Sequence, residues 1–379
     1  MFDLNLRKHD WVLFGVMIML AVFGLVMIFS TTLNAQSAVE GRGAFRLQVM
    51  YLLLGLFLYF FLSGINYRIL QPLAKPLFVL STLLLFMVLL IGSQGKEVAR
   101  WFDFGIVHLQ PAEIAKLTMV IVLSSVLAGR SRYASSFHFM FDTLLILLVP
   151  IGLILIQPDL GTAMIFIALW LGMMVGIGVD IRYLFYSISS LLAMIPLAWP
   201  FLKDYQKQRL ISFIDPASDP RGSGYNAIQA KIAVGAGGIL GVGLGQGTQS
   251  RFKFLPVRHT DFIFSVVAEE LGIIGASILL VLFALLLLRI LRAAAAAQDN
   301  FGRYLSIGFF SVFLAQIFIN IGMNISIMPV TGVPLPFISY GGSSLWLSLA
   351  MLGFIQSIVS HTQSAEYTRD IGHMRLVIH

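Results

Sequence analysis

Long runs of apolar residues, separated by short polar segments, follow one another along almost the whole chain. A helix needs about 20 apolar residues to cross the hydrocarbon of a bilayer. The pattern predicts ten membrane-spanning helices, at residues 11–30, 47–64, 77–92, 112–128, 141–156, 161–178, 184–201, 262–288, 304–327 and 341–360. The third and fifth are short, and we expect tilt or burial among neighbours to accommodate them. The fold class is therefore all-α and polytopic, with a single transmembrane domain over residues 1–379.

The composition agrees with lipid as the main solvent. Of the 379 residues, 58% are hydrophobic and 11% are charged, whereas about a quarter of a soluble domain is charged. Cysteine is absent, which excludes disulfides, a thiol nucleophile and thiolate metal ligands. The seven histidines form no close pair, so we expect no metal site built from histidine. The polar segment 1–10 lacks a cleavage-like site, which predicts a retained first span rather than a signal peptide.

The distribution of positive charge predicts the orientation of the spans. An even number of spans places both termini on one side, and short cytoplasmic segments are enriched in lysine and arginine. With a cytoplasmic N-terminus, the cytoplasmic segments carry twelve of the 25 lysines and arginines and the short outer loops carry four. One more, Lys116, lies within a span, and eight lie in the long segment 202–261, which weighs little in this rule. We therefore expect cytoplasmic termini and a large extracytoplasmic loop at about 202–261, between spans seven and eight.

This loop contains seven glycines between residues 235 and 247. Their spacing matches neither GxGxxG nor GxxxxGK[ST], which argues against a nucleotide-binding loop. Two interpretations stay open. The glycines allow the main chain to approach a ligand closely and to present N–H donors, or they form a flexible or re-entrant surface loop.

The loop ends with a basic cluster, Arg251, Lys253, Arg258 and His259, followed by Asp261. Asp261 lies where the eighth span begins, so one interpretation makes it a helix N-cap. Contact with lipid head groups is the corresponding interpretation of the basic residues.

Two adjacent carboxylates, Glu269 and Glu270, follow inside the eighth span. A charged residue at mid-membrane costs about 2.5–3.5 kcal/mol on the insertion scale. The pair must therefore face a wet cavity, contact cations or be protonated, and an intramembrane carboxylate indicates function by default.

Charged residues also mark segment 95–116. Glu113 and Lys116 are three residues apart and share one helix face. We expect them to form an ion pair, either as a structural element or as part of a site. Trp101 is typical of an interface anchor, and beside Arg100 it could also face a substrate.

Two further segments complete the outer side. Asp159 precedes the sixth span and suits its N-cap. Segment 328–344 contains three prolines, which predicts irregular backbone at membrane depth, tolerated only against protein or a water-filled cavity. The charged residues at or near the outer leaflet predict a mixed cavity that suits an anionic, lipid-anchored substrate: Arg100, Glu113, Lys116, Asp159, Arg209, Lys231, Arg258 and Asp261.

At these positions the chain resembles the SEDS family, the RodA/FtsW group of bacterial peptidoglycan polymerases. The matching strings occur in family order over nearly the whole chain: ARWFDFG, LQPAEIAK, QPDLGT, YQKQR, the glycine-rich loop, LPVRHTDFIFSVVAEELG and GVPLPFISYGGSS. The string DPASDPRGSGYNAIQAKIA followed by GTQS, and the short N-terminus, resemble the RodA branch rather than the FtsW branch. One departure is LQPAE, where the family usually has QPSE, and Ala112 should not alter the chemistry.

The resemblance implies a glycosyltransferase that polymerises lipid II into β-1,4 glycan strands at the outer face of the bacterial cytoplasmic (inner) membrane during cell elongation. It also implies a class B penicillin-binding transpeptidase as a membrane partner. The expected ligands are lipid II and membrane lipids, and we expect no nucleic acid.

The resemblance further assigns the catalytic base to Asp261, which would take a proton from the acceptor 4-hydroxyl as undecaprenyl diphosphate leaves with inversion. Cations would stabilise the departing diphosphate, and a divalent ion, Mg²⁺ or Mn²⁺, could share that task. The expected substrate-binding residues are Arg100, Trp101, Glu113, Lys116, Asp159, Arg209, Lys231, Arg258, His259 and Glu269.

Two alternatives stay open, a transporter that flips lipid II and a non-catalytic scaffold that activates a penicillin-binding protein. A carrier needs a path to both faces, whereas the polar residues crowd one leaflet and no inverted repeat is visible.

Overall fold

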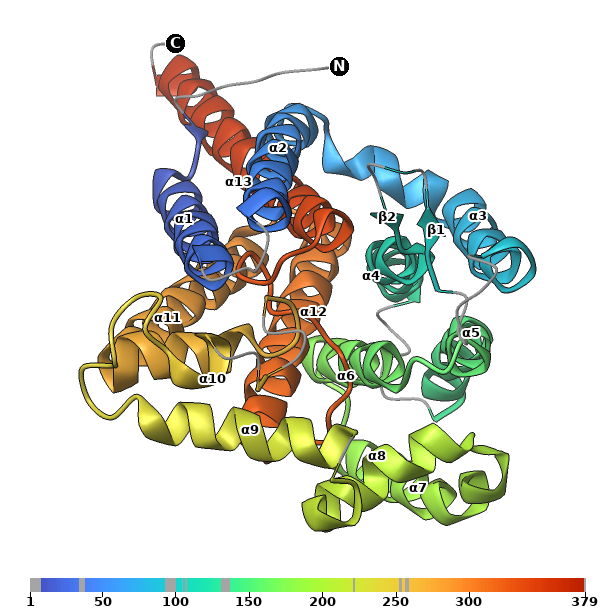
Figure 1. Cartoon of the computed structure of the whole chain (residues 1–379). Coiled ribbons are helices and arrows are strands. Elements are labelled where there is room, and N and C mark those ends of the chain that lie inside the picture. Colours follow the sequence, from blue (N-terminus) through green and yellow to red (C-terminus); the bar gives the residue numbers. More distant parts are fainter. Residues whose placement is uncertain are drawn as a thin grey trace.

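The computed structural model describes residues 8–33, 38–92, 100–103, 105, 108–130, 137–220, 222–251, 254–255 and 259–377, and these are mostly helical (Figure 1). The α-helices are α1 Trp11–Leu33, α2 Ala38–Ser63, α3 Leu70–Ile91, α4 Pro111–Arg130, α5 Phe137–Ile156, α6 Leu160–Ile177, α7 Ile181–Ala198, α8 Asp204–Ile214, α9 Ser223–Ala236, α10 Thr248–Arg251, α11 Ile263–Ala296, α12 Asn300–Asn324 and α13 Gly342–Val377. Short 3-10 helices lie at Tyr67–Ile69, Trp199–Phe201 and Pro216–Ser218. Strands β1 Phe102–Asp103 and β2 His108–Leu109 pair antiparallel. The predicted all-α class is confirmed.

Nine helices within the described ranges are long and apolar enough to cross a membrane. They coincide with nine of the ten predicted spans, and α7 covers the remaining one without belonging to the nine. The third and fifth spans are not short, because α3 begins at Leu70 and α5 at Phe137. In α3 the exposed Lys75 lies inside the helix, and a long basic side chain can keep its charge in water while its stem covers apolar surface.

Helix α11 differs most from its prediction. It continues to Ala296, past the expected end at 288, and includes most of the alanine run 293–297. Alanine has the highest helix propensity, so the run extends the helix instead of ending it.

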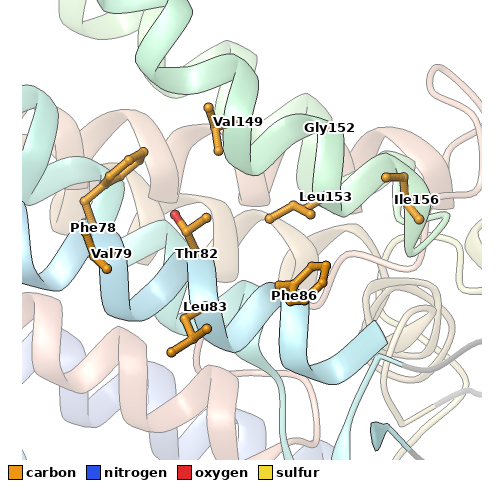
Figure 2. Close-up of a pocket in the computed structure, with 9 residues that line it drawn as sticks. All are labelled: Phe78, Val79, Thr82, Leu83, Phe86, Val149, Gly152, Leu153 and Ile156. Carbon is orange, nitrogen blue, oxygen red and sulfur yellow. The ribbon is translucent and has the colours of Figure 1, made fainter. Parts of the chain in front are cut away.

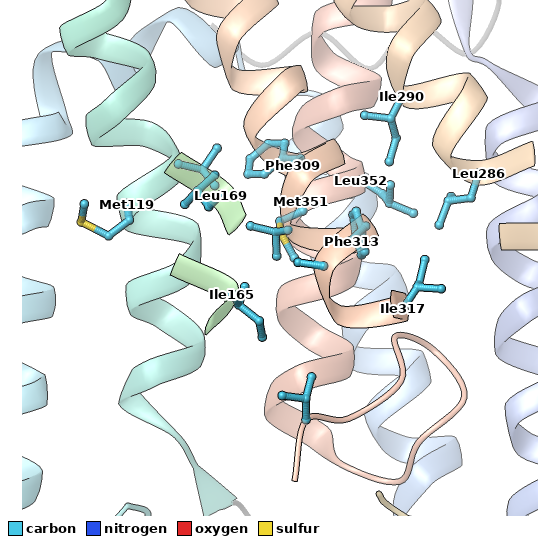
Figure 3. Close-up of a cluster of buried hydrophobic side chains, with 14 of the residues drawn as sticks. Met119, Ile165, Leu169, Leu286, Ile290, Phe309, Phe313, Ile317, Met351 and Leu352 are labelled. Carbon is cyan, nitrogen blue, oxygen red and sulfur yellow. The ribbon is translucent and has the colours of Figure 1, made fainter. Parts of the chain in front are cut away.

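Helix α12 lies at the centre of the bundle. In the most apolar part of α12 78% of the residues are buried, against 22% for the span that contains α3. Figure 3 shows Phe309 and Phe313 of α12 among side chains of the surrounding helices, including Ile165, Leu286 and Met351. Helix α12 is therefore surrounded by protein, whereas α3 presents most of its surface outward.

The helices alternate in direction, so α1 begins and α13 ends at the same end of the bundle (Figure 1). At this end, called the terminal end below, Nη2 of Arg289 lies 2.6 Å from Oδ2 of Asp10. Arg68 is joined there to Asp299, with Nε 2.8 Å from Oδ2. The opposite end, called the site end, contains the described residues of the segments 100–110, 157–159, 198–262 and 325–341.

The segment 202–261 is folded rather than flexible where the structure describes it. It contains α8, α9, α10 and a 3-10 turn, and α9 packs against α11 and α8. Figure 1 shows α7, α8 and α9 together at the bottom of the view. The loop predicted from sequence is thus a structured layer over the site end.

The glycine-rich run forms a re-entrant turn against a break in α11. Gly272 has φ 66° and ψ −164°, which interrupts the helix and suits glycine alone. The N–H groups of Val242 and Gly243 donate to the carbonyls of Glu269 and Glu270, both at 3.0 Å. In return, the N–H of Ile273 donates to the carbonyl of Gly238 at 2.9 Å.

These reciprocal bonds explain part of the glycine content of the run. A Cβ on Gly241 would collide with the main chain of α11 at Glu270, so the glycine allows close approach to a helix. The turn is fixed against α11, and the N–H groups of Val242 and Gly243 are used by α11. Contact of the remaining glycines with a ligand stays a prediction.

Candidate active site

Asp261 lies directly before α11 without capping it. The N-cap of α11 is Phe262, which makes no side-chain cap bond, so the N-cap interpretation of Asp261 is wrong. Its carboxylate accepts a hydrogen bond from the side chain of Thr260. A Cβ on Gly332 would lie 3.3 Å from Oδ2 of Asp261, so the glycine leaves space beside the carboxylate.

Two buried asparagines on α12 fix the main chain of Asp261. Nδ2 of Asn320 and Nδ2 of Asn324 both donate to the Asp261 carbonyl at 3.0 Å. Asn320 also donates to the carbonyl of Val333 at 2.7 Å, and Oδ1 of Asn324 accepts from the N–H of Ser265 at 3.0 Å. The asparagines thus tie the start of α11 to the segment 325–341. Their signal in the sequence is two amides four residues apart in an apolar helix, which our sequence reasoning did not use.

Segment 325–341 holds the residues before Asp261 in place. It is non-helical between α12 and α13, as the prolines predicted. Oγ of Ser339 donates to the carbonyl of Thr260 at 2.6 Å, and the N–H of Tyr340 donates to the carbonyl of His259 at 2.8 Å. The His259 ring lies 5.6 Å from the Tyr340 ring, centroid to centroid. Asp261 is therefore positioned from α12 on one side and from this segment on the other.

Two arginines and a tyrosine lie beside the start of α6. Nε of Arg100 donates to the carbonyl of Gln157 at 2.9 Å, and its Nη2 donates to the carbonyl of Pro158. The Tyr205 hydroxyl donates to the same Pro158 carbonyl. Arg209, one turn further along α8, lies over the Tyr205 ring at 5.6 Å and donates to the carbonyl of Thr331 at 3.4 Å. Tyr205 lies in the string YQKQR, but no role was predicted for it from the sequence.

The charges of these residues act on one another. Burial raises the pKa of the Asp261 carboxyl, and Asp159 adds to the rise, whereas Thr260, Arg209 and Arg100 act against it. Burial and the nearby Arg100 lower the pKa of the Arg209 guanidinium, while Asp261 and Asp159 act against that change. Two acidic and two basic groups therefore share one field, and Asp261 is a stronger proton acceptor than an exposed aspartate.

Asp159 is the N-cap of α6, as predicted. Its Oδ1 accepts from the N–H of Thr162 and its Oδ2 from the Thr162 hydroxyl, both at 3.0 Å. Gln110 Nε2 lies 3.4 Å from the same Oδ2. The carboxylate thus stabilises the helix start and also contributes to the field around Asp261.

Glu113 and Lys116 form the predicted ion pair, with Nζ 2.7 Å from Oε1. Both are buried on α4, with 3% and 2% of their surfaces exposed. The full burial of both partners favours a structural role, and substrate contact by either stays a prediction.

Glu269 is turned toward the end of the glycine-rich segment. Its Oε1 accepts from the N–H of Gln249 at 2.9 Å and from the Thr248 hydroxyl at 3.2 Å. It therefore fixes α10, about ten residues before Asp261 in the chain. The neighbouring Glu270 accepts from the Ser30 hydroxyl, so both intramembrane carboxylates are hydrogen-bonded to protein groups.

Two of the three remaining predicted site residues lie in the described part of the chain. Trp101 is 38% exposed, next to Arg100. Lys231 is on the exposed side of α9, and within the described residues no hydrogen bond or ion pair joins it to Asp261. Arg258 lies outside the described residues. Their predicted contacts with substrate stay predictions.

Comparisons with known proteins place this fold in a family. The chain matches the family model of cell cycle proteins that comprises FtsW, RodA and SpoVE, over residues 10–364. The peptidoglycan glycosyltransferase MrdB of Escherichia coli K12 is 38% identical over 344 residues, which are 90% of this chain and 93% of MrdB. The probable peptidoglycan glycosyltransferase FtsW of Geobacter metallireducens is 35% identical over 371 residues, covering 94% of this chain and 97% of that relative.

Solved structures agree with the sequence relatives. One similar structure is a chain of a peptidoglycan synthase complex that coordinates polymerization and crosslinking. It is 34% identical to this chain with a TM-score of 0.79, and the match covers 93% of this chain and 98% of that one. The Thermus thermophilus rod shape determining protein RodA is 30% identical with a TM-score of 0.68, covering 93% of this chain and 96% of RodA. This multi-pass membrane chain therefore belongs to the SEDS family of FtsW, RodA and SpoVE.

Proposed function

We propose that this protein is a peptidoglycan glycosyltransferase that polymerises lipid II during cell elongation. The observation that carries the proposal is the partly buried Asp261 carboxylate, which caps no helix and lies in one field with Arg100 and Arg209. The names of MrdB and FtsW support the reaction. The rod shape determining RodA supports the role in elongation.

Asp261 accepts the proton of the attacking hydroxyl. The 4-hydroxyl of one lipid II attacks the anomeric carbon of another, and its proton moves to a carboxylate oxygen of Asp261. The new carbon–oxygen bond forms as the bond from the anomeric carbon to the diphosphate breaks. One inverting displacement converts the α-linked diphosphate into a β-glycoside, and a positioned base contributes about 10²–10⁴-fold to such a step.

Arg100 and Arg209 stabilise the departing undecaprenyl diphosphate. Within the described residues neither arginine forms an ion pair, since both donate to main-chain carbonyls. Their charges are therefore available to a ligand that gathers negative charge in the transition state. Tyr205 orients both, through its hydroxyl near Arg100 and its ring under Arg209.

The site end faces outward from the bacterial cytoplasmic membrane, and the terminal end faces the cytoplasm. The excess of lysine and arginine in the short segments of the terminal end supports this orientation. Lipid II would then be used on the outer leaflet, where the glycan strand is needed.

A class B penicillin-binding transpeptidase is the proposed membrane partner. The structural neighbour belongs to a peptidoglycan synthase complex that coordinates polymerization with crosslinking. A partner that crosslinks the strand would act on the product of this site.

A divalent cation, Mg²⁺ or Mn²⁺, would be held chiefly by the substrate diphosphate. Among the described residues no group of three or more histidines or carboxylates could hold a metal ion. Asp159 and Asp261 are the carboxylates of the site, and Mg²⁺ is commonly bound by one or two carboxylates together with substrate phosphates. The ion would supply added charge stabilisation for the leaving diphosphate.

Purified protein, lipid II in detergent and gel analysis of the product test the function. We expect glycan polymer without a second glycosyltransferase. If the protein flips lipid II in liposomes and forms no polymer, it is a carrier. If polymer forms only when a penicillin-binding protein is added and that protein makes the polymer, this chain is a scaffold.

A further inference from the structure

An apolar groove lies between α3 and α5. It has a volume of about 650 Å³. Figure 2 shows Phe78, Thr82 and Phe86 of α3 on one side and Val149, Gly152 and Ile156 of α5 on the other. Thr82 provides the single polar side chain of the lining.

The groove opens to the surroundings of the bundle. Phe86 is 47% exposed and Ile156 is 61% exposed, although both helices are membrane spans. Nothing lies within 4 Å of a Cβ placed on Gly152, so this glycine provides space where a larger side chain would fill the groove. The apolar walls suit a hydrocarbon occupant, because the lining offers a single hydroxyl as a polar group. Between membrane spans such an occupant is held by packing contacts.

One end of the groove reaches the candidate active site. Ile156 is followed directly by Gln157 and Pro158, whose carbonyls accept from Arg100. The Gln157 side chain, which is buried, donates to the carbonyl of Leu85 on α3 at 2.8 Å. The same short segment thus closes the groove and holds an arginine of the site.

We propose that the α3–α5 groove binds the polyprenyl chain of a lipid-linked diphosphate whose diphosphate meets Arg100. The inference rests on the proposed function and adds the location of the lipid chain. A ligand with a diphosphate and a long branched hydrocarbon in one molecule uses the arginine and the groove together. Ordinary phospholipid acyl chains share the hydrocarbon chemistry, and the experiment separates the two sources.

The first test fills the groove with Gly152→Phe and compares two substrates. One is lipid II with its full-length chain, and the other is an analogue with two isoprene units. For the long-chain substrate we expect KM to rise about tenfold, or about 1.4 kcal/mol of lost packing in the groove, with kcat unchanged. For the short-chain analogue KM should not change.

Gly15→Phe is the matched control, because a Cβ on Gly15 of α1 also meets nothing within 4 Å. It should leave KM for both substrates unchanged. Val149→Trp fills the same groove and serves if Gly152→Phe does not give folded protein. An equal effect of both groove variants on the two substrates, or none on either, would overturn the inference. Absence of polymer from the unmodified protein with either substrate would instead contradict the proposed function.

Crosslinking identifies the lipid. A photoreactive amino acid in place of Leu83, which also lines the groove, should capture a radiolabelled polyprenyl diphosphate. Unlabelled polyprenyl diphosphate should compete, and phosphatidylglycerol at equal concentration should not. Equal competition by the two lipids would assign the groove to phospholipid and reject the proposal.

Discussion

Two aspartates, one at each end of the bundle, show how differently the protein treats the same side chain. At the terminal end, Asp299 accepts from the Tyr67 hydroxyl at 2.6 Å, from Arg68 at 2.8 Å and from the N–H of Gly302 at 2.7 Å. Burial alone raises its pKa, but these hydrogen bonds together bring the pKa of Asp299 below its usual value. At the site end, burial raises the pKa of Asp261 and the nearby arginines reverse this only in part.

The difference separates structural from functional charge. The donors around Asp299 favour its ionised form, and the hydrogen bonds join Tyr67 and Arg68 to the start of α12. Asp261 keeps a higher proton affinity, and the arginines near it donate to main-chain carbonyls instead of to carboxylates. Similar residue types therefore stabilise the fold at one end and prepare proton transfer at the other.

The largest expected effect is a loss of activity from a substitution at the site end that leaves the fold intact. Asp261→Asn should lower the rate of polymerisation by about 10²–10⁴-fold, because the amide cannot accept the hydroxyl proton. Rates from purified protein and lipid II, with thermal unfolding to confirm the fold, provide the measurement. Asp299→Asn is the matched control and should keep the rate within about twofold. Near-normal polymerisation by Asp261→Asn would remove Asp261 from the chemistry.

The pH profile sharpens the comparison. A base must be ionised, so kcat/KM falls as the pH drops through the pKa of Asp261, above the 3.8 of an ordinary aspartate. Arg209→Gln removes a group that lowers this pKa, so the acidic limb should move to higher pH. Asp159→Asn removes a group that raises it and still caps α6, so the limb should move to lower pH. Shifts of the same sign in both variants would contradict the shared field.

The buried ion pair of Glu113 and Lys116, next to the site end, tests whether charged residues in this region can also stabilise the fold. Glu113→Gln leaves Lys116 buried without a counter-charge, and we expect a loss of about 3–5 kcal/mol in the free energy of unfolding. Exchange of the two residues, Glu113→Lys with Lys116→Glu, should restore most of it. Chemical denaturation in detergent measures the stability, and activity is measured per folded molecule. A stable but inactive exchange variant would assign the pair to substrate binding.

The smallest effect concerns the terminal end. Asp299→Ala removes the N-cap of α12, worth about 1 kcal/mol, while the half-exposed Arg68 adds little because solvent screens it. Since the pKa of Asp299 is lowered on folding, its contribution is complete above the unfolded value of 3.8. It disappears as the pH falls through the folded value. The difference in unfolding temperature between the two proteins should therefore shrink as the pH is lowered below 3.8, with polymerisation at pH 7 unchanged. A gap that persists at low pH would exclude the ionised Asp299 as its cause.

Much of this arrangement follows from local sequence signals. Apolar runs predict the spans because each helix must match the bilayer by itself. The Asp159 cap, the Glu113–Lys116 pair and the irregular segment after Met328 depend on neighbours within a few residues, and all three are present.

The signals fail where partners are distant in sequence. Asn320 holds the carbonyl of Asp261 across 59 residues, and Tyr205 bonds Pro158 across 47. No local pattern states such a pairing. The helices α8 and α9 were missed for a related reason, since a long polar and glycine-rich segment predicts a loop until the surface that packs against it is known.

The break in α11 has a consequence for how the protein is made. The turn of residues 237–243 bonds its main chain to α11 around Glu269–Ile274, and ribosomes synthesise the turn first. Until α11 has entered the bilayer, the N–H groups of Val242 and Gly243 lack these acceptors, and burying them in lipid would be costly. The turn can therefore settle only after the eighth span is inserted. The break at Gly272 thereby imposes an order of assembly on this region. A substitution of Gly272 should give protein that inserts into the membrane but does not pack the turn against α11.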